Sequence, residues 1–468
     1  MKYGMKSRVS TLMAAVMAAL SFSACGSGSS GGGTPPPSSA NEWAWMNGAS
    51  IANQPGTYGS LGTAASSNVP GAREQAISWL DASGNFWLFS GNGFDSVGNS
   101  GFLNDLWKYS SGQWTWMGGS NVVDQPGAYG PLGTAASSNV PGARNSEVRW
   151  IDASGNFWLF GGGGYDSNGT LGRLNDLWKY GAGQWTWMSG SNTVNQPGTY
   201  GTQGTAATGN VPGARFHAVS WIDASGDFWL FGGNVNALNS AGEFYLNDLW
   251  KYSAGQWTWM SGSSTIDQPG MYGIEGTASV NNVPGAREQA FGWTDASGNF
   301  WLFGGNGYDS NGNYGFLNDL WKYSAGQWTW MGGASVVDQP GTYGTQGTAV
   351  AGNVPGARNS GVSWIDASGN LWLFGGGGYD ASGSLGRLND LWKYGAGQWT
   401  WTSGSNIADE PGTYGTLGTA ASSNVPGARF HAAGWIDASG TFWFFGGNAN
   451  TLNGPGEVYL NDLWKYEP

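Results

Sequence analysis

The stretch FWLFGGGGYDSNGTLGRLNDLWKYGAGQWTW, residues 157–187, decides the fold. It contains a hydrophobic run that ends in glycines, a second run that ends at Tyr180, and a third run that ends at Trp187. Short aromatic and β-branched runs separated by Gly and Asn are typical of β-strands joined by turns. The first run, residues 157–160, has no polar alternation, so we expect both of its faces to be covered.

Versions of this block occur six times along the chain at nearly constant intervals, the last without its third run. The Arg of a P-G-A-R motif marks them at positions 73, 144, 215, 287, 358 and 429. In the first unit we expect strands at residues 76–80, 86–89, 103–109 and 114–117. A period this long, with four strand-like runs per unit, indicates a β-propeller.

The count of Trp residues predicts how the ring closes. Thirty Trp residues are shared out as five per unit. The chain ends at Pro468, before a fourth strand of the last unit, whereas residues 42–46 (EWAWM) form a strand without a unit of its own. We therefore predict an all-β, six-bladed β-propeller of four-stranded blades whose last blade is completed by the N-terminal strand, which leaves no free sheet edge.

Three marks of the repeat resemble a known family. Phe160-Gly161-Gly162, residues 174–180 (LNDLWKY) and the Trp pair 185 and 187 are similar to a kelch repeat. The resemblance covers residues 41–468 and implies a propeller like the central domain of galactose oxidase. The first unit departs from it with Ser90-Gly91 in place of Gly-Gly, and each unit carries an insertion such as residues 189–212.

The connections between the strands of such a blade predict which face of the propeller binds ligands. In an up-and-down blade, the connections from strand two to three and from strand four to the next blade emerge on one face, which we call the decorated face. The insertions carry one Tyr per unit, which either packs its loop onto the rim or offers an aromatic platform to a sugar or peptide. These residues are Tyr58, Tyr129, Tyr200, Tyr272, Tyr343 and Tyr414.

The candidate site follows from a duplication. The six units are two copies of a set of three, so that Phe216-His217, for example, returns as Phe430-His431, and the three blade types differ just after the repeat Arg. We expect these side chains at the channel mouth on the decorated face, in pseudo-twofold arrangement; the alternative is that they only solvate a water-filled channel. The predicted ligand-binding residues are Glu74, Gln75, Asn145, His217, Glu288, Gln289, Asn359 and His431.

Catalytic and metal chemistry finds little support in the sequence. The copper chemistry of galactose oxidase is excluded because the chain has only two His and one Cys. We expect Glu74 and Glu288 to lie too far apart for glycoside hydrolysis, and the repeat Arg to pair with a repeat carboxylate such as Asp105. We predict no catalytic residue, no metal site and no cofactor; the oxygen-rich turns at residues 166–169 and 309–313 would suit calcium only weakly, since Asx turns explain them.

The N-terminus indicates export. Residues 1–24 have a basic start and an apolar stretch typical of a signal peptide, and Cys25 follows in a sequence that resembles a bacterial lipobox. The resemblance implies a lipid on Cys25, a linker over residues 25–40 and an outer-membrane lipoprotein that faces the periplasm or the cell surface. We expect no other membrane contact.

The remaining composition narrows the function. Most Lys and Arg residues occupy fixed repeat positions and the net charge is −12, so nucleic acid is not an expected partner. We predict a monomeric, non-catalytic binding scaffold for a protein or carbohydrate ligand at the cell envelope. The alternatives are a sugar-modifying enzyme, which the resemblance implies because some bacterial periplasmic kelch proteins are sialic-acid epimerases, and a purely structural envelope protein.

Overall fold

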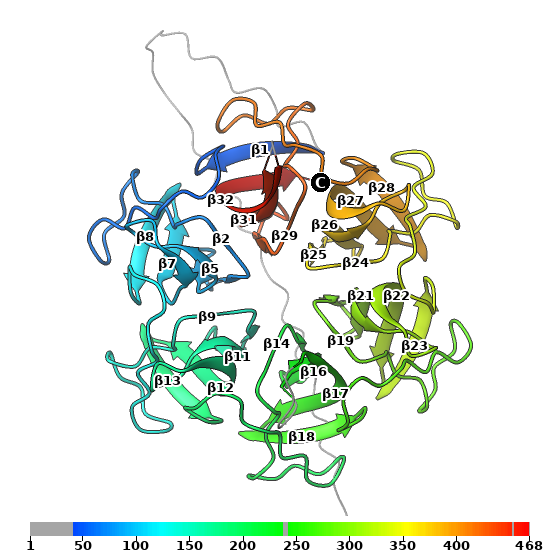
Figure 1. Cartoon of the computed structure of the whole chain (residues 1–468), viewed down its shortest axis with the longest axis horizontal. Coiled ribbons are helices and arrows are strands. Elements are labelled where there is room, and N and C mark those ends of the chain that lie inside the picture. Colours follow the sequence, from blue (N-terminus) through cyan, green and yellow to red (C-terminus); the bar gives the residue numbers. More distant parts are fainter. Residues whose placement is uncertain (1–40, 237–241, 452–453, 468) are drawn as a thin grey trace, which may run out of the picture. The chain divides into compact units, whose positions relative to one another are not determined.

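Six blades of antiparallel β-strands surround a central axis in the computed structural model, as Figure 1 shows. The structure describes residues 41–236, 242–451 and 454–467, so the predicted signal peptide, Cys25 and the linker lie outside the described residues. The regular structure of the described part consists of 32 strands, and no helix within it is long and apolar enough to span a membrane. The predicted all-β, six-bladed propeller is confirmed.

The first three blades contain the strands β2 to β18. Blade one has β2 (Arg73–Glu74), β3 (Ile77–Leu80), β4 (Phe86–Phe89), β5 (Asn92–Phe94), β6 (Ser100–Phe102), β7 (Leu106–Ser110) and β8 (Gln113–Gly118). Blade two has β9 (Arg144–Asn145), β10 (Val148–Ile151), β11 (Phe157–Tyr165), β12 (Leu171–Gly181) and β13 (Gln184–Ser189). Blade three has β14 (Arg215–Phe216), β15 (Val219–Ile222), β16 (Phe228–Val235), β17 (Phe244–Ser253) and β18 (Gln256–Ser261).

The last three blades contain the strands β19 to β32 and β1. Blade four has β19 (Arg287–Glu288), β20 (Phe291–Thr294), β21 (Phe300–Tyr308), β22 (Tyr314–Ser324) and β23 (Gln327–Gly332). Blade five has β24 (Arg358–Asn359), β25 (Val362–Ile365), β26 (Leu371–Tyr379), β27 (Leu385–Gly395) and β28 (Gln398–Ser403). Blade six has β29 (Arg429–Phe430), β30 (Ala433–Ile436), β31 (Phe442–Thr451), β32 (Gly454–Glu467) and β1 (Glu42–Asn47).

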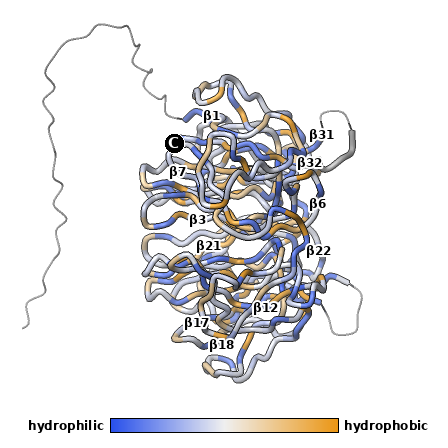
Figure 2. The backbone as a smooth tube through the Cα atoms, turned by 90° about the vertical axis from the view of Figure 1, so that its left-hand side faces the viewer, coloured by the Kyte–Doolittle hydropathy of each residue, from blue (hydrophilic) through white to orange (hydrophobic). Residues whose placement is uncertain are grey.

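In blade one β4 covers the predicted residues 86–89, but in blades two to six the two middle strands run further than this pattern predicted. In blade two, β11 and β12 continue past the double glycine as a long hairpin, with a bulge between Phe160 and Gly162. A Cβ atom on Gly162, whose φ is 98°, would lie 2.6 Å from the carbonyl oxygen of Asn145, so only glycine fits there. The hairpin arm pairs with the two-residue strand β9 and thereby holds the repeat Arg and its neighbour near the axis. Figure 2 shows the ring from the side.

The N-terminal strand closes the ring as predicted. Strand β1 pairs antiparallel with β32, with Trp43 opposite Tyr466 and Trp45 opposite Trp464, and Figure 1 shows the two strands side by side. The Trp43 side chain is 3% exposed and its ring lies 5.2 Å from that of Phe374 in blade five. Strand β1 therefore completes the sheet of blade six and also packs against its neighbour.

A buried ion pair anchors every blade, which confirms the predicted partner of the repeat Arg. The Arg73 guanidinium donates to both carboxylate oxygens of Asp105, at 2.6 and 2.7 Å, and both side chains are fully buried. Such bidentate pairs are among the stronger hydrogen-bonded contacts in proteins. The equivalent pairs are Arg144–Asp176, Arg215–Asp248, Arg287–Asp319, Arg358–Asp390 and Arg429–Asp462.

The insertion tyrosines pack their loops onto these ion pairs. Tyr58 is 5% exposed, its hydroxyl donates to Asp105 at 2.7 Å, and its ring contacts Trp107 and Trp116. The other five tyrosines make the same hydrogen bond in their own blades. The interpretation of these rings as an exposed platform is therefore wrong, because each hydroxyl is used to satisfy a buried carboxylate.

Candidate functional site

A ring of backbone hydrogen bonds surrounds the propeller axis. The second residue after each repeat Arg has a left-handed backbone, with φ between 55° and 59°. Its N–H donates to the carbonyl of the equivalent residue in the preceding blade, at 2.7 to 3.3 Å. None of the six is glycine, so each carries backbone strain of about 1–2 kcal/mol, which the ring of hydrogen bonds offsets. These residues are Gln75, Ser146, His217, Gln289, Ser360 and His431.

Two His–Glu pairs flank this axis. His431 Nδ1 lies 3.0 Å from Glu74 Oε2, and His217 Nδ1 lies 2.9 Å from Glu288 Oε2. The two imidazole rings face each other almost in parallel, with centroids 5.8 Å apart. Each pair joins residues of two adjacent blades, so the His–Glu contacts cross the blade boundaries at opposite sides of the ring.

Two glutamine amides bridge the histidines. The Nε2 atoms of Gln75 and Gln289 each lie 3.0 to 3.3 Å from the Nε2 atoms of both His217 and His431. The oxygen of each Gln accepts a hydrogen bond from an Asn amide, at 2.5 Å from Asn145 to Gln75 and 2.7 Å from Asn359 to Gln289. We call these eight residues the axial network. They are the two glutamines, the two asparagines, the two histidines and the two glutamates.

One protonation pattern satisfies the axial network. If each Gln amide donates to His Nε2, that nitrogen is an acceptor and the proton of the neutral ring sits on Nδ1, from which it is donated to Glu. Burial lowers the pKa of His431 and outweighs the nearby Glu74 carboxylate. Burial alone would raise the pKa of Glu74, but the hydrogen bonds from His431 and Asn448 hold it below its ordinary value. A neutral His431 imidazole beside the Glu74 carboxylate is thus the stable state near neutral pH.

All eight residues predicted as a ligand site lie together in the axial network. Their polar groups hydrogen-bond to one another, and the peptide ring surrounds the axis beside them. Glu74 and Glu288 are 7% and 6% exposed. Their use in ligand binding stays a prediction, and any ligand at the axis has to compete with these internal hydrogen bonds.

Two arginines that the sequence did not assign extend the network outward. Arg387 donates to the Asn448 side chain at 2.8 Å, and Asn448 donates to Glu74 at 3.2 Å. The Arg387 guanidinium also lies 4.7 Å from the ring centroid of Phe430. Arg173, its counterpart in the first half of the duplication, stacks on Phe216 in the same way. These two arginines occur once per half of the chain and not once per blade. This difference from the repeat was the sequence signal that could have identified them as site residues.

A second departure from the repeat lies between blades one and two. Ser90 replaces the first glycine of the double glycine, and Glu147 stands where the other units have Ala or Gly. The Ser90 hydroxyl donates to Glu147 Oε1, while Glu147 Oε2 has no hydrogen-bond partner among the described residues. Burial raises the pKa of Glu147 from 4.5 to about 7.

Glu147→Gln is expected to stabilise the protein at pH 8 and to leave it unchanged at pH 4.5. The raised pKa means that folding opposes ionisation of Glu147, so stability is lost as pH rises from 4.5 through about 7. The lost stability is on the order of 3 kcal/mol. Urea unfolding midpoints at the two pH values measure it, with the exposed Glu275→Gln as control; an equal effect of Glu147→Gln at both pH values would contradict the assignment.

The oxygen-rich turns bind their own backbone. Asp309 Oδ1 accepts from the N–H groups of Asn311 and Asn313, at 2.8 and 2.9 Å, and Asp166 repeats the arrangement. These are Asx turns. The described residues contain no group of three or more His, Cys, Asp or Glu side chains that could hold a metal ion.

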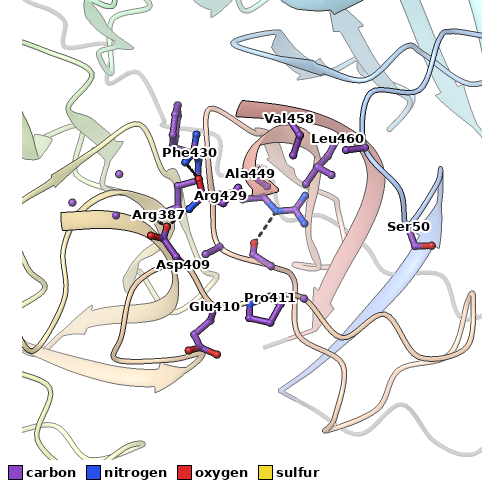
Figure 3. Close-up of a pocket in the computed structure, with 18 of the residues that line it drawn as sticks. Ser50, Arg387, Asp409, Glu410, Pro411, Arg429, Phe430, Ala449, Val458 and Leu460 are labelled. Carbon is purple, nitrogen blue, oxygen red and sulfur yellow. Dashed lines mark hydrogen bonds between the residues drawn. The ribbon is translucent and has the colours of Figure 1, made fainter. Parts of the chain in front are cut away.

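A groove of about 1020 Å³ lies on the decorated face between blades five and six (Figure 3). We call it the blade-six groove. Its floor includes Ala449 and Val458, its rim includes Ile51, Leu385 and Glu410, and its inner end reaches Phe430, the neighbour of His431 in the axial network. Its volume lies at the upper end of the range for ligand pockets.

Comparison with known proteins finds distant structural similarity. No protein-family model and no curated protein matches the chain. A solved structure of YjhT is similar at 15% identity and a TM-score of 0.49, covering 84% of this chain and 95% of that chain. A novel fungal alcohol oxidase of the AA5 family, in complex with copper, is similar at 13% identity and a TM-score of 0.43, covering 88% of this chain and 77% of that chain. Both similarities concern the fold and not the chemistry of the site.

Proposed function

We propose that this propeller is a non-catalytic recognition module that binds a protein or glycan on its decorated face. One observation carries the proposal. The His and Glu side chains at the axis are buried and paired with one another, whereas a groove of ligand size opens beside them. A general acid or base has to reach its substrate directly or through one water, while a binding surface needs only an accessible, shaped lining.

A glycan array probed with residues 41–468, followed by recovery of the bound sugar, tests this function. We expect the recovered sugar to be chemically unchanged. Proton NMR checks this, because it distinguishes epimers and anomers. The double variant Glu74→Gln and Glu288→Gln should change affinity only. If no glycan binds, a protein partner is favoured and is sought by crosslinking.

The competing function is a sugar-modifying enzyme that uses the His–Glu pairs of the axial network as acid and base. Its specific support is that each imidazole is already hydrogen-bonded to a carboxylate, as acid–base catalysts often are. Conversion of a bound sugar by the unmodified protein, lost in the Glu74→Gln and Glu288→Gln double variant, would establish this alternative and overturn the binding proposal.

The cellular setting is also a proposal. A lipid on Cys25 would tether the propeller to the outer membrane through the linker, and we expect a monomer that touches the membrane only through this anchor. The sequence of residues 1–25 supports it. Mass spectrometry of the N-terminal peptide after membrane fractionation tests for the lipid.

A further inference from the structure

One side chain at the rim of the blade-six groove differs from the residue that the other five units have at the same position. Five of the six insertions contain a Q-P-G motif, whose Gln amide donates to the backbone carbonyl two residues earlier, at 2.8 to 3.0 Å. In the sixth unit the residue is Glu410. A carboxylate has no hydrogen to donate, so this hydrogen bond is lost.

The backbone around Glu410 is unchanged by the substitution. Its carbonyl accepts a 2.9 Å hydrogen bond from the Ala428 N–H, as the carbonyl of Gln196 does from Ala214 in blade three. The Glu410 carboxylate has no hydrogen-bond or ion-pair partner among the described residues, and Figure 3 places it at the edge of the groove. The change therefore supplies a free negative charge without altering the loop.

The floor of the groove differs from its counterpart in the first half of the duplication. In blade three, Val235 lies opposite Phe244 on adjacent strands; in blade six the same positions hold Ala449 and Val458. Both substitutions remove side-chain volume at one cross-strand pair. Blade six thus has more open space, as well as the extra charge of Glu410.

The other charged side chains at this rim make hydrogen bonds within the protein. Arg387 is held by Asn448 and Asn450 and lies over Phe430. Asp409 accepts hydrogen bonds from the Arg387 N–H and the Asn450 amide. Glu410 makes no such contact among the described residues, so its carboxylate adds to the negative charge of the exposed Asp409 at this rim, and the two together favour a cation.

The apolar part of the lining favours a peptide over a sugar. Ile51 and Leu385 are 64% and 55% exposed, and Val458, Leu460 and Phe316 continue the apolar surface. Sugars present hydroxyl groups that need hydrogen-bonding partners, whereas aliphatic walls match apolar side chains. The volume exceeds the needs of a single amine and suits a peptide segment of several residues.

We infer, building on the proposed recognition function, that the blade-six groove binds a peptide segment of a partner protein in which Lys or Arg stands beside an apolar residue. The cation pairs with Glu410, and the apolar side chain lies against Leu385 and Val458.

A positional-scanning library of fluorescein-labelled hexapeptides, titrated with residues 41–468, tests the inference by fluorescence polarisation. We expect a preference for Lys or Arg at one position next to Leu, Ile or Phe, and weaker binding at higher salt. Glu410→Gln, which installs the residue of the other five units, should lower affinity for the selected peptide at least tenfold and abolish the preference for the cation. The double variant Ala449→Val and Val458→Phe installs the larger residues of blade three. It should block binding because these side chains fill the floor of the groove.

Matched controls place the same charge elsewhere. Gln196→Glu and Gln339→Glu should leave the affinity unchanged, because they lie at other blade boundaries. An unchanged affinity in Glu410→Gln, or no cation-selective binding by the library, would overturn the inference. That failure leaves the recognition function intact, since turnover of a bound sugar, measured separately, is the result that would refute it.

Discussion

Asp319→Asn should lower the unfolding free energy by about 3–5 kcal/mol. Both oxygens of Asp319 accept hydrogen bonds from Arg287, at 2.7 Å each. Oδ2 also accepts from the Tyr272 hydroxyl and the Trp321 indole, both at 2.7 Å. An Asn side chain turns an NH₂ group toward these donors and leaves a fully buried guanidinium without its counter-charge.

The measurement is the urea unfolding midpoint, followed by far-ultraviolet circular dichroism and Trp fluorescence. Asp338→Asn is a matched control, because the equivalent positions 53 and 195 already hold Asn, and it should shift stability by less than about 0.5 kcal/mol. Arg287→Met combined with Asp319→Leu should recover part of the loss, since an apolar pair leaves no buried charge, although Tyr272 and Trp321 lose their acceptor. A loss below about 1 kcal/mol in Asp319→Asn would show that the ion pair does not anchor its blade.

These buried pairs also show what sequence reasoning can reach. The repeat spacing and the strand patterns were enough to predict six blades, their closure by residues 42–46 and the partner of Arg73. They also predicted that Glu74, His217 and their equivalents meet near the axis. All of these follow from topology, since residues at the inner end of each blade have to lie around one axis.

The internal bonding of the axis could not be predicted in this way. It depends on the left-handed backbone of Gln75 and its equivalents. The sequence does not indicate this conformation, because none of these residues is glycine. The Ser90–Glu147 contact was hidden for a different reason. Each departure from the repeat is visible alone, but their pairing requires knowing that Ser90 faces the next blade. The change from Gln to Glu410 becomes informative only when the hydrogen bond of the five Gln side chains is seen.

Removal of strand β1 should have the largest effect on the fold. A protein that comprises residues 48–468 loses Trp43, whose ring contacts Phe374, Phe444 and Tyr466 at centroid distances of 5.2, 5.6 and 4.8 Å. Truncation of one buried Trp to Ala already costs about 3–5 kcal/mol. The deletion in addition removes the whole β1–β32 pairing and exposes β32 as an unpaired edge, which promotes aggregation. We therefore expect a much lower unfolding midpoint and concentration-dependent aggregation.

Residues 41–468 provide the matched control, because this protein keeps β1 and lacks only the segment before it. A synthetic peptide of residues 41–49, added to the protein that comprises residues 48–468, should restore the midpoint and suppress aggregation by filling the empty position beside β32. Size-exclusion chromatography with light scattering follows the aggregation. If residues 48–468 alone were monomeric with the midpoint of the longer protein, closure by β1 would not contribute to stability, and the ring would be held by the contacts between the other blades.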